Sequence, residues 1–484
     1  MSICDGIVNA RFLHFFEELS AIPRISGHTE AATRYLVSYA QKEDLPYYVD
    51  EKGNVIIYKA GQKCAPDTEP VILQGHIDMV GDKAPDSDHD FLTDPLSLSL
   101  DGDDLHADRT TLGADDGIAA AYMLAILEDP ESVYPPIEAV FTVDEEIGLQ
   151  GAAALDMTKL KGKRLINIDS EEEGILTAGC AGGMSVTTEL SLKRIEAEGM
   201  TATITLSGLK GGHSGVMIDK GRGNAIKMMG RLLYELKEMV SLRLISLEGG
   251  ARDNVIPFRA VARVLLENEE DAALIGTHID ILKAVYAHEL AGVDDGLEIA
   301  IEMTGQGEAA VMTQDALNRV LAFLLNTPYG VQAMERHIPD LVETSANLGR
   351  VSCTDKVFTA LSSVRSSITS KRDQIGDAMT ALARSLDGRT RIDGTYPAWE
   401  FRDKSPLREV MCDVYRKMTG KDMVVEAVHA GLECGIFYQA IEDLDAVSIG
   451  PNIRDIHTYN ETLSLSSARR VYAYLRDVLK ALAQ

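Results

Sequence analysis

The spacing of hydrophobic and polar positions along the chain divides it into three stretches. Up to residue 184, short apolar runs alternate with segments of helical period, which is typical of an α/β domain with a largely parallel central sheet flanked by helices. From residue 185 to residue 387, apolar and polar residues alternate as in antiparallel strands with one exposed face. Residues 388–484 return to the first pattern. We therefore predict an α/β domain of residues 1–184 and 388–484, with an α+β domain of residues 185–387 inserted into it.

In the first stretch, several apolar runs end at charged residues. "VILQGHIDMV" (residues 71–80) predicts a buried strand, and "IEAVFTVDEEIG" and "RLINIDSEEEG" predict strands that end in acids. "GADDGIAAAYMLAILED" predicts a Gly-rich turn that leads into a buried helix. Residues 7–43 predict two helices around "IPRISGH", and residues 47–61 predict a hairpin. Functional groups of such domains gather beyond the carboxyl ends of the parallel strands, so we expect a site there.

The later stretches carry fewer charged strand ends. "NAIKMMGRLLYELKEM" and "TQDALNRVLAFLLNTPYG" have helical period within the inserted stretch. In the last stretch we predict a helix at Pro406–Thr419, a strand at "DAVSIGP" and a final helix from about Leu465. These elements complete the first domain.

The predicted strand at residues 71–80 contains an imidazole and a carboxylate two positions apart. Residues i and i+2 of a strand point to the same face, so His76 and Asp78 project together. Both need partners, because burying an unpaired charge is costly. One interpretation is a hydrogen-bonded pair in the core. The other is a metal ligand with the carboxylate that orients it.

Other acids and imidazoles lie at strand or loop ends, and each has an ordinary explanation. Asp115 occupies a position typical of a helix cap. Glu145 and Glu146 are typical of a solvated loop, and His457 is typical of a surface histidine. Taken together with His76 and Asp169, they form a nitrogen and oxygen ligand set that suits Zn²⁺, Mn²⁺ or Co²⁺. A carboxylate such as Asp115 can bridge two metals. That arrangement leaves Asp78 to hold the ring of His76, and leaves one of the two glutamates to act as a base.

Composition excludes several classes of protein. The chain of 484 residues carries 75 acidic and 47 basic residues, a net charge of −28 that disfavours binding to nucleic acid or anionic membranes. Its six cysteines are scattered without a CxxC pair, which argues against a disulfide scaffold or a thiolate zinc site. The N-terminal sequence has no signal-peptide pattern, and the longest strongly apolar run, Ile118–Leu127, is too short to span a bilayer. We expect a cytoplasmic protein.

The charged motifs have a familiar order along the chain. "GHIDMV", "LGADDG", "DEEIG", "INIDSEEEG" and "IHTYNE" resemble, in order and spacing, the metal motifs of the co-catalytic zinc peptidases, which include carnosinases, aminoacylases and glutamate carboxypeptidase-like enzymes. "LKGGHSGVMIDKGRGNA", "SANLGRV", "VRSS" and "HAGLECGIF" are most similar to the bacterial aminoacyl-histidine dipeptidases. The resemblance covers essentially the whole chain. It implies a dinuclear metal-dependent hydrolase of Xaa-His and related dipeptides.

The resemblance also implies a role for each metal-site residue. His76 and Asp169 would hold one divalent metal, most readily zinc, and Glu146 and His457 the other. Asp115 would bridge the two metals, and Asp78 would orient His76. The general base would be Glu145, a choice between the two glutamates that comes from the resemblance alone. Mn²⁺ and Co²⁺ are alternatives to zinc.

Substrate-binding roles follow from the same resemblance. His213 in "GGHSG" would donate to the oxyanion from the inserted domain, in its own or a partner subunit's site, and Arg365 would pair with the substrate carboxylate. Asn254 and Gly431 would line the pocket. His429 and Glu433, in "HAGLECG", are expected to have a pocket or structural role because the metal set is already complete.

The inserted domain would serve as a lid and would form a homodimer. Alternatives within the same fold are an aminoacylase, a tripeptidase or another amidohydrolase, which differ in pocket size. A catalytically silent relative that only binds metal is a further alternative. Its mark would be a lost ligand or a lost Glu145, and neither is lost here.

Overall fold

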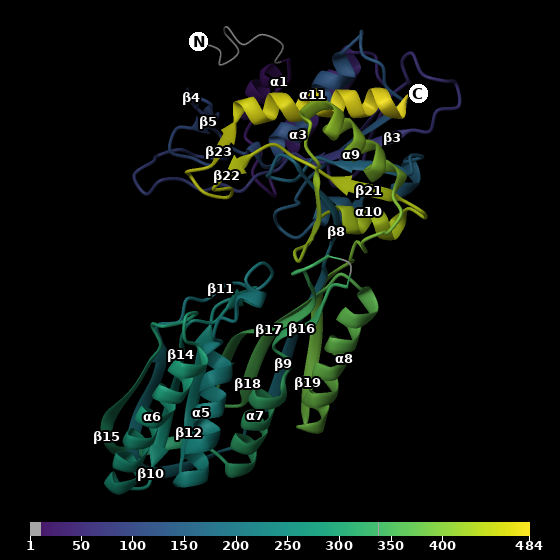
Figure 1. The fold of residues 1–484 in the computed structure, drawn as a ribbon. Helices are drawn as coiled ribbons and strands as arrows, with labels where there is room; N and C mark the ends of the chain where they lie inside the picture. The colour runs from purple at the N-terminus through teal and green to yellow at the C-terminus, as the bar shows by residue number, and fades with distance from the viewer. Residues whose placement is uncertain (1–10, 337) are drawn as a thin grey trace. The chain divides into compact units, whose positions relative to one another are not determined.

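The computed structural model describes residues 11–336 and 338–484. The chain forms two compact units, which Figure 1 shows. The first four residues of the first predicted helix, residues 7–10, lie outside the described residues, as does Cys4. The first unit comprises residues 1–180, 399–427 and 432–484, and the second comprises residues 181–398 and 428–431.

An eight-stranded sheet forms the centre of the first unit. Its strands are β1 (Tyr47–Val49), β2 (Val55–Lys59), β3 (Val71–His76), β6 (Ile137–Thr142), β7 (Arg164–Asn167), β8 (Ile175–Cys180), β20 (Val424–Val428) and β21 (Asp445–Ser448). They lie in the order β1-β2-β6-β3-β7-β21-β8-β20. β3 runs parallel to β6 and β7, and β7 runs parallel to β21, whereas β1 and β2 add antiparallel edge strands. The predicted, largely parallel central sheet is confirmed.

Helices pack around this sheet, and one of them is buried on all sides. They are α1 (Arg11–Ser20), α2 (Glu30–Lys42), α3 (Ala114–Glu128), α4 (Gln150–Ala154), η1 (Met157–Lys159), α9 (Pro406–Thr419), α10 (Cys434–Ala440) and α11 (Leu465–Leu482). The residues Ala114–Leu127 of α3 are all buried, as expected for a helix that is apolar all round. Helices from both ends of the chain therefore share one hydrophobic core.

A small sheet in the same unit frames the segment that carries His457. Its strands are β4 (Leu98–Asp101), β5 (Asp104–Ala107), β22 (Ile453–Arg454) and β23 (Thr462–Ser464). β22 pairs with β23, and β23 pairs with β5. His457 lies in the loop between β22 and β23, so this pairing fixes both ends of the loop.

The second unit is built on an antiparallel sheet with helices packed on it. Its strands are β9 (Gly182–Ser191), β10 (Arg194–Ser207), β12 (Arg243–Gly250), β14 (Ala260–Leu266), β15 (Glu298–Met312), β16 (Gly330–Met334), β17 (Val342–Cys353), β18 (Val357–Ser366) and β19 (Gly388–Tyr396). They follow the order β15-β10-β14-β12-β17-β18-β9-β19, with β16 paired to β17. The other elements are β11 (Gly212–His213), β13 (Val255–Ile256), α5 (Ala225–Met239), α6 (Glu269–Glu289), α7 (Gln314–Asn326), α8 (Thr369–Ser385) and η2 (Ile218–Lys220). This antiparallel unit matches the predicted α+β character.

Two local predictions need correction. β3 ends at His76, so Asp78 lies in the segment after the strand and not on the face of a continuing strand. Asp115 does not act as the cap of α3, because Gly113 occupies the N-cap position and both carboxylate oxygens of Asp115 contact imidazoles instead of N–H groups of the helix. No helix in the described part of the chain has the length and apolar character that crossing a membrane requires.

Candidate metal centre and substrate residues

Asp115 contacts two imidazoles from opposite parts of the chain, one with each carboxylate oxygen. Its Oδ1 lies 3.1 Å from Nε2 of His76, and its Oδ2 lies 3.0 Å from Nε2 of His457. His76 ends β3, Asp115 is the second residue of α3, and His457 comes from the loop after β22. The three side chains therefore meet at the carboxyl end of the parallel sheet, where ligands of such folds bind.

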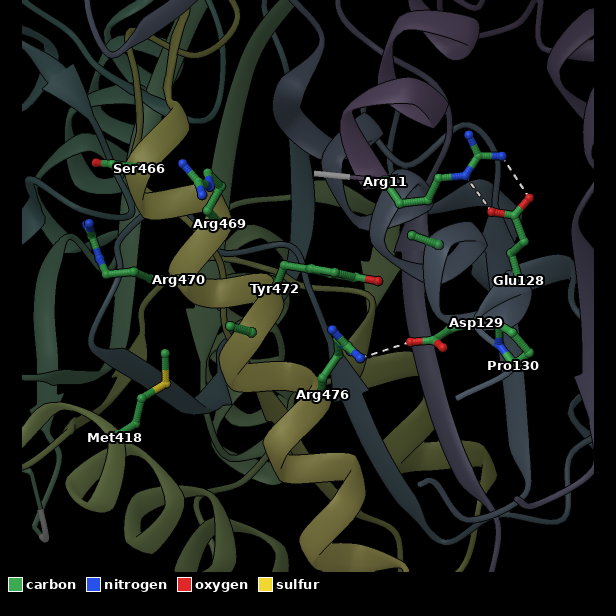
Figure 2. Close-up of a pocket in the computed structure, with 12 residues that line it drawn as sticks. Arg11, Glu128, Asp129, Pro130, Met418, Ser466, Arg469, Arg470, Tyr472 and Arg476 are labelled. Atoms are coloured by element: carbon green, nitrogen blue, oxygen red, sulfur yellow. Dashed lines mark hydrogen bonds and ion pairs between the residues drawn. The ribbon is translucent and has the colours of Figure 1, made fainter. Parts of the chain in front are cut away.

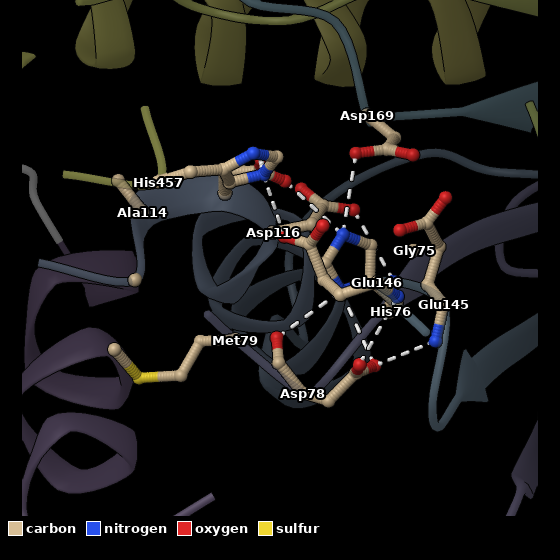
Figure 3. Close-up of polar contacts among 12 residues, drawn as sticks. Gly75, His76, Asp78, Met79, Ala114, Asp116, Glu145, Glu146, Asp169 and His457 are labelled. Carbon is tan, nitrogen blue, oxygen red and sulfur yellow. Dashed lines mark hydrogen bonds and ion pairs between the residues drawn. The ribbon is translucent and has the colours of Figure 1, made fainter. Parts of the chain in front are cut away.

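Two further carboxylates complete the group, as Figure 3 shows. Asp169 follows β7 and places Oδ1 3.5 Å from Nε2 of His76. Glu146 follows β6 and places Oε1 2.8 Å from Nε2 of His457. The five residues predicted as metal ligands are thus brought together. In the described part of the chain, three sets of potential ligand atoms lie within 4.8 Å of one another: His76–Asp116–Asp169, His76–Glu145–Glu146 and Asp115–Glu146–His457.

Asp116 belongs to one of these sets, although it was not among the residues predicted as ligands. Its Oδ2 accepts the backbone N–H of His76 at 3.3 Å. Burial, followed by the charge of Asp169, raises the pKa of Asp116 well above its ordinary value. The adjacent pair of aspartates in "LGADDG" was the available signal, but only the fold shows that both face His76.

Asp78 holds the turn that carries the two glutamates as well as the ring of His76. Its carboxylate oxygen Oδ1 lies 3.4 Å from Nδ1 of His76, while the hydrogen bond of that nitrogen goes to the backbone carbonyl of Asp78 at 3.1 Å. The Asp78 carboxylate accepts the hydroxyl of Ser26 at 2.8 Å and the backbone N–H groups of Glu145 and Glu146 at 3.1 and 3.3 Å. One carboxylate therefore connects the strand ends of β3 and β6.

Two residues beside the centre adopt the left-handed backbone conformation, which is strained for side chains other than glycine. Asp144 precedes Glu145 and has φ +54°, and His457 has φ +62°. The side chain of Asp144 accepts the N–H of Gly27 at 2.6 Å and pairs with Lys52 at 2.6 Å. These contacts hold the turn in place despite the strain.

Burial and mutual charge strongly perturb the ionisable groups of the centre. Burial raises the pKa of Asp169 to about 7 against the opposing effect of His76. Burial favours protonation of Asp115 too, but its hydrogen bonds to His457 and His76 hold its pKa below the ordinary value. The hydrogen bond to Asp115 and the close contact with the Glu146 carboxylate raise the pKa of His457 to about 10. Buried carboxylates gathered around two imidazoles are an environment that a dication stabilises.

Glu146 provides a direct test of whether the group fits a metal. Its Oε1 is buried and approaches His457 without the alignment of a hydrogen bond. A buried carboxylate oxygen without a hydrogen-bond donor is costly, and metal coordination removes that cost. The mixed oxygen and nitrogen donors suit zinc, manganese or cobalt. The residues present therefore fit a divalent metal site.

Glu433 belongs to a buried polar network next to the centre. Its Oε2 accepts hydrogen bonds from Thr142 at 2.6 Å and from Gln74 at 2.5 Å, and Asn167 donates to Gln74 at 2.7 Å. Oε1 of Glu433 is buried without a hydrogen-bond partner, and burial raises the pKa of the residue to about 7. Glu433 is therefore held by the core of the first unit and is absent from the three sets of potential metal ligands.

His213 lies in the second unit with a defined tautomer. Its Nδ1 accepts the backbone N–H of Gly215 at 3.2 Å, so the proton of the neutral ring is on Nε2. Burial and then the charge of Arg365 lower the pKa of His213. The ring is thus a neutral hydrogen-bond donor at Nε2.

Arg365 and Gly431 meet at one aromatic ring of the second unit. Arg365, on β18, donates from Nη1 to the hydroxyl of Tyr396 at 3.0 Å, and its Nε is buried without a hydrogen-bond partner. A Cβ atom on Gly431 would lie 2.7 Å from the ring of Tyr396. Glycine is therefore required for this close approach, which lets the ring support the guanidinium.

Asn254 and His429 lie near His213 in the same unit. The backbone carbonyl of Asn254 accepts the N–H of Ser214 at 2.9 Å, and its side-chain Oδ1 is buried without a partner. His429 shares a 2.7 Å hydrogen bond with Ser345, and burial followed by the charge of Arg365 lowers its pKa to about 3. His429 is neutral and belongs to the unit that carries His213, not to the metal group.

A hollow lies elsewhere on the first unit, between the start of α1 and helix α11 (Figure 2). It measures about 990 Å³, and its arginines include Arg11 and Arg476. Arg11 pairs with Glu128, and Arg476 pairs with Asp129. None of the clustered potential ligands lines this hollow, so the ligand group and not the hollow defines the candidate site.

The fold and the ligand group define a metallopeptidase class, and comparison with known proteins agrees. The model of Peptidase family M20/M25/M40 matches residues 72–481. The chain therefore belongs to this family and is a peptide-bond hydrolase.

Individual relatives span the full length of the chain. The chain is 36% identical over 470 residues to the cytosol non-specific dipeptidase of Escherichia coli strain K12, covering 96% of both chains. It is similar to the crystal structure of aminoacylhistidine dipeptidase from Vibrio alginolyticus, with a TM-score of 0.92 and 34% identity over 99% of this chain and 98% of that one. A tripeptidase from Staphylococcus aureus matches with a TM-score of 0.60 at 16% identity, covering 98% of both chains, and shares the fold.

Proposed function

We propose that this chain is a dinuclear metal-dependent dipeptidase that hydrolyses Xaa-His and related dipeptides. The observation that carries the proposal is the position of Asp115, whose two carboxylate oxygens each lie about one hydrogen-bond length from a different imidazole. A carboxylate so placed would be a ligand of two divalent metals. The Escherichia coli and Vibrio alginolyticus relatives are named as dipeptidases, which supports dipeptides as the substrates.

The proposed ligands follow the geometry of the group. His76 and Asp169 would hold one ion, Glu146 and His457 the other, and Asp115 both. Zinc is the metal we favour, and manganese and cobalt suit the same donors. When bound, the metal pair would lower the pKa of a water molecule to near neutrality and polarise the substrate carbonyl.

Glu145 is the proposed general base. Burial raises its pKa well above the ordinary value, and its backbone N–H is held by Asp78. A buried carboxylate with a raised pKa takes a proton readily at neutral pH. Glu145 would accept the proton of the attacking water and then deliver it to the leaving amine, which needs that proton to depart.

The second unit supplies the proposed substrate contacts. Arg365 would pair with the carboxylate of the dipeptide, since a buried guanidinium with an unpartnered Nε has donor capacity left for it. His213 would donate from Nε2 to the oxyanion, which suits its neutral tautomer. Asn254 and Gly431 would line this pocket. We further propose a homodimer formed through the second unit, and a cytoplasmic location, since the Escherichia coli relative is named as a cytosol dipeptidase.

A substrate panel measured with metal content tests the proposal. Purified protein loaded with zinc, manganese or cobalt is assayed on Xaa-His dipeptides, the same dipeptides as C-terminal amides, tripeptides and N-acetyl amino acids. We expect two metal ions per chain and the highest kcat/KM on free dipeptides, with loss of activity on the amides because Arg365 then lacks its partner. Preferred cleavage of tripeptides or N-acetyl amino acids would contradict the dipeptidase assignment.

A further inference from the structure

Four consecutive backbone N–H groups that precede and include Asp115 point at one buried carboxylate, that of Glu461. Its Oε2 accepts the N–H groups of Leu112 and Gly113 at 2.9 Å each. Its Oε1 accepts those of Ala114 at 2.8 Å and Asp115 at 3.3 Å. Glu461 is 1% exposed. This carboxylate therefore fixes the main chain from which the Asp115 side chain projects.

A buried guanidinium holds the same segment through its carbonyl side. Arg24 is 1% exposed and donates from Nη2 to the carbonyl of Gly113 at 2.6 Å. Its Nη1 donates to the carbonyls of Ile77 at 2.9 Å and Asp78 at 3.4 Å. The carbonyl of Asp78 is also the partner of the His76 ring. Arg24 thus connects the segment after β3 to the segment before α3.

Glu461 and Arg24 both bind the main chain of Gly113, one at its N–H and the other at its carbonyl. Gly113 has φ +65°, and a Cβ atom there would lie 2.6 Å from Arg24 Nη2. Only glycine leaves room for this pair of contacts, which we call the Arg24–Glu461 clamp.

The clamp also relates Asp115 to the second imidazole. Glu461 follows His457 by four residues and directly precedes β23, which pairs with β5. Its carboxylate therefore fastens the loop of His457 to the main chain of Asp115. Displacing Glu461 would alter the distance between Asp115 Oδ2 and His457 Nε2, the 3.0 Å contact of the second ligand set.

We propose that Arg24 and Glu461 are positioning residues that keep Asp115 between His76 and His457 for the metal pair. The inference rests on the proposed function, because it takes these three residues as ligands. The clamp touches main-chain atoms, so it acts on ligand position. Contacts that orient ligands typically change metal affinity by about 10–100-fold.

The test compares two buried glutamates of the first unit that make the same kind of contact. Glu461→Gln replaces an acceptor oxygen by an NH₂ group that faces backbone N–H donors. Glu138→Gln is the matched control, because Glu138 is 4% exposed and accepts the N–H groups of Lys161 and Gly162 at 2.9–3.0 Å. It lies near the start of β6, away from the strand end that leads to Glu146.

The decisive quantity is the zinc affinity of metal-stripped protein, measured by competition with a chelator. Thermal unfolding of the metal-free variants is measured alongside it. We expect both variants to lose thermal stability, and only Glu461→Gln to bind zinc about 10–100-fold more weakly. Arg24→Lys, which keeps the charge but loses the fork of donors, should also weaken zinc binding. Glu461→Asp, which keeps the charge but shortens the reach, carries the test if Glu461→Gln does not fold.

Zinc affinity at the wild-type level in the folded Glu461 variant would overturn the proposed role of the clamp. A contact with a purely structural role would lower stability without changing zinc affinity. An equal loss of zinc affinity in Glu138→Gln would overturn it as well. The wild-type protein separates this failure from that of the proposed function. Wild-type protein that binds fewer than two zinc ions, or that does not cleave dipeptides, contradicts the function and not the clamp.

Discussion

The pKa values of buried carboxyl groups in the first unit are shifted in opposite directions at different residues. Hydrogen bonds from two imidazoles hold the pKa of Asp115 below its usual range, whereas burial raises the pKa values of Glu145 and Glu433. The same fold therefore lowers the pKa of one buried carboxyl group and raises the pKa values of two others. The raised pKa of Glu145 makes it a better proton acceptor, which suits the role of base proposed for it.

Replacing Glu145 by glutamine should remove proton transfer while leaving the metal ligands in place. We expect kcat of Glu145→Gln to fall by about 10²–10⁴-fold, because an amide cannot accept the proton of water. Metal content, measured by elemental analysis, should equal that of the wild type. Glu172→Gln, at an exposed position of "DSEEEG", is the control and should keep its activity. Unchanged kcat in Glu145→Gln would reject its role as base.

Glu433 should make the stability of the metal-free protein depend on pH. Its pKa is about 7 when folded and 4.5 as the ordinary value, so the unfolded state releases its proton first as pH rises. The stabilising effect of the buried neutral acid is complete below pH 4.5 and is lost as the pH rises to 7. This loss lowers the free energy of unfolding by about 3 kcal/mol. Glu433→Gln cannot ionise, so chemical denaturation should show a smaller loss of stability between pH 5 and 7.5 (about the window set by these pKa values). Equal pH dependence in both proteins would contradict this account.

Much of the candidate metal site could be predicted at the residue scale, but its supports could not. His76, Asp115 and His457 stand in short motifs whose residue types suit a metal. Glu461 stands in the same motif as His457, but neither its role nor that of Arg24 can be read from the sequence, because their partners are main-chain atoms far away in sequence. Glu461 lies 346 residues from Asp115, and only the folded chain shows that they are in contact.

At the scale of elements, strand ends and helix starts position the side chains of the centre. β3 and β6 run parallel, so His76 and the turn carrying Glu146 emerge at the same edge. The predicted helix at Pro406–Thr419 has the observed bounds, and the last helix begins at Leu465 as predicted. β3 is shorter than its apolar run indicates, because Arg24 binds the carbonyls that follow its end.

The contact between β3 and α3 should depend on the absence of a side chain at Gly75. A Cβ atom there would lie 2.4 Å from Asp116 Oδ2 and 2.5 Å from Ala119 Cβ. We expect Gly75→Ala to lower the free energy of unfolding by about 1–3 kcal/mol through overpacking, and to weaken metal binding because α3 carries Asp115. Denaturant titration and chelator competition measure the two effects.

The control for this prediction is a glycine with free space around it. Gly276 lies within α6, and a Cβ atom there would meet nothing within 4 Å. Gly276→Ala should raise stability by about 0.5–1 kcal/mol, since alanine has the higher helix propensity. Destabilisation of both variants to the same extent would show that close packing at Gly75 is not the cause.

At the scale of the whole molecule, the proposed centre exists only when distant parts of the chain fold together. The five candidate ligands extend from residue 76 to residue 457, across the segment that forms the second unit. Their order along the sequence could be read from motifs, whereas their convergence depends on the parallel sheet and on the loop between β22 and β23. The net charge of −28 is consistent with a protein that gathers carboxylates around cations.

Anomalous diffraction from crystals of the zinc-loaded protein tests this account most directly. We expect two peaks about 3.5–4 Å apart, with one oxygen of Asp115 directed at each. A single peak, or peaks that Asp115 does not touch, would contradict the account.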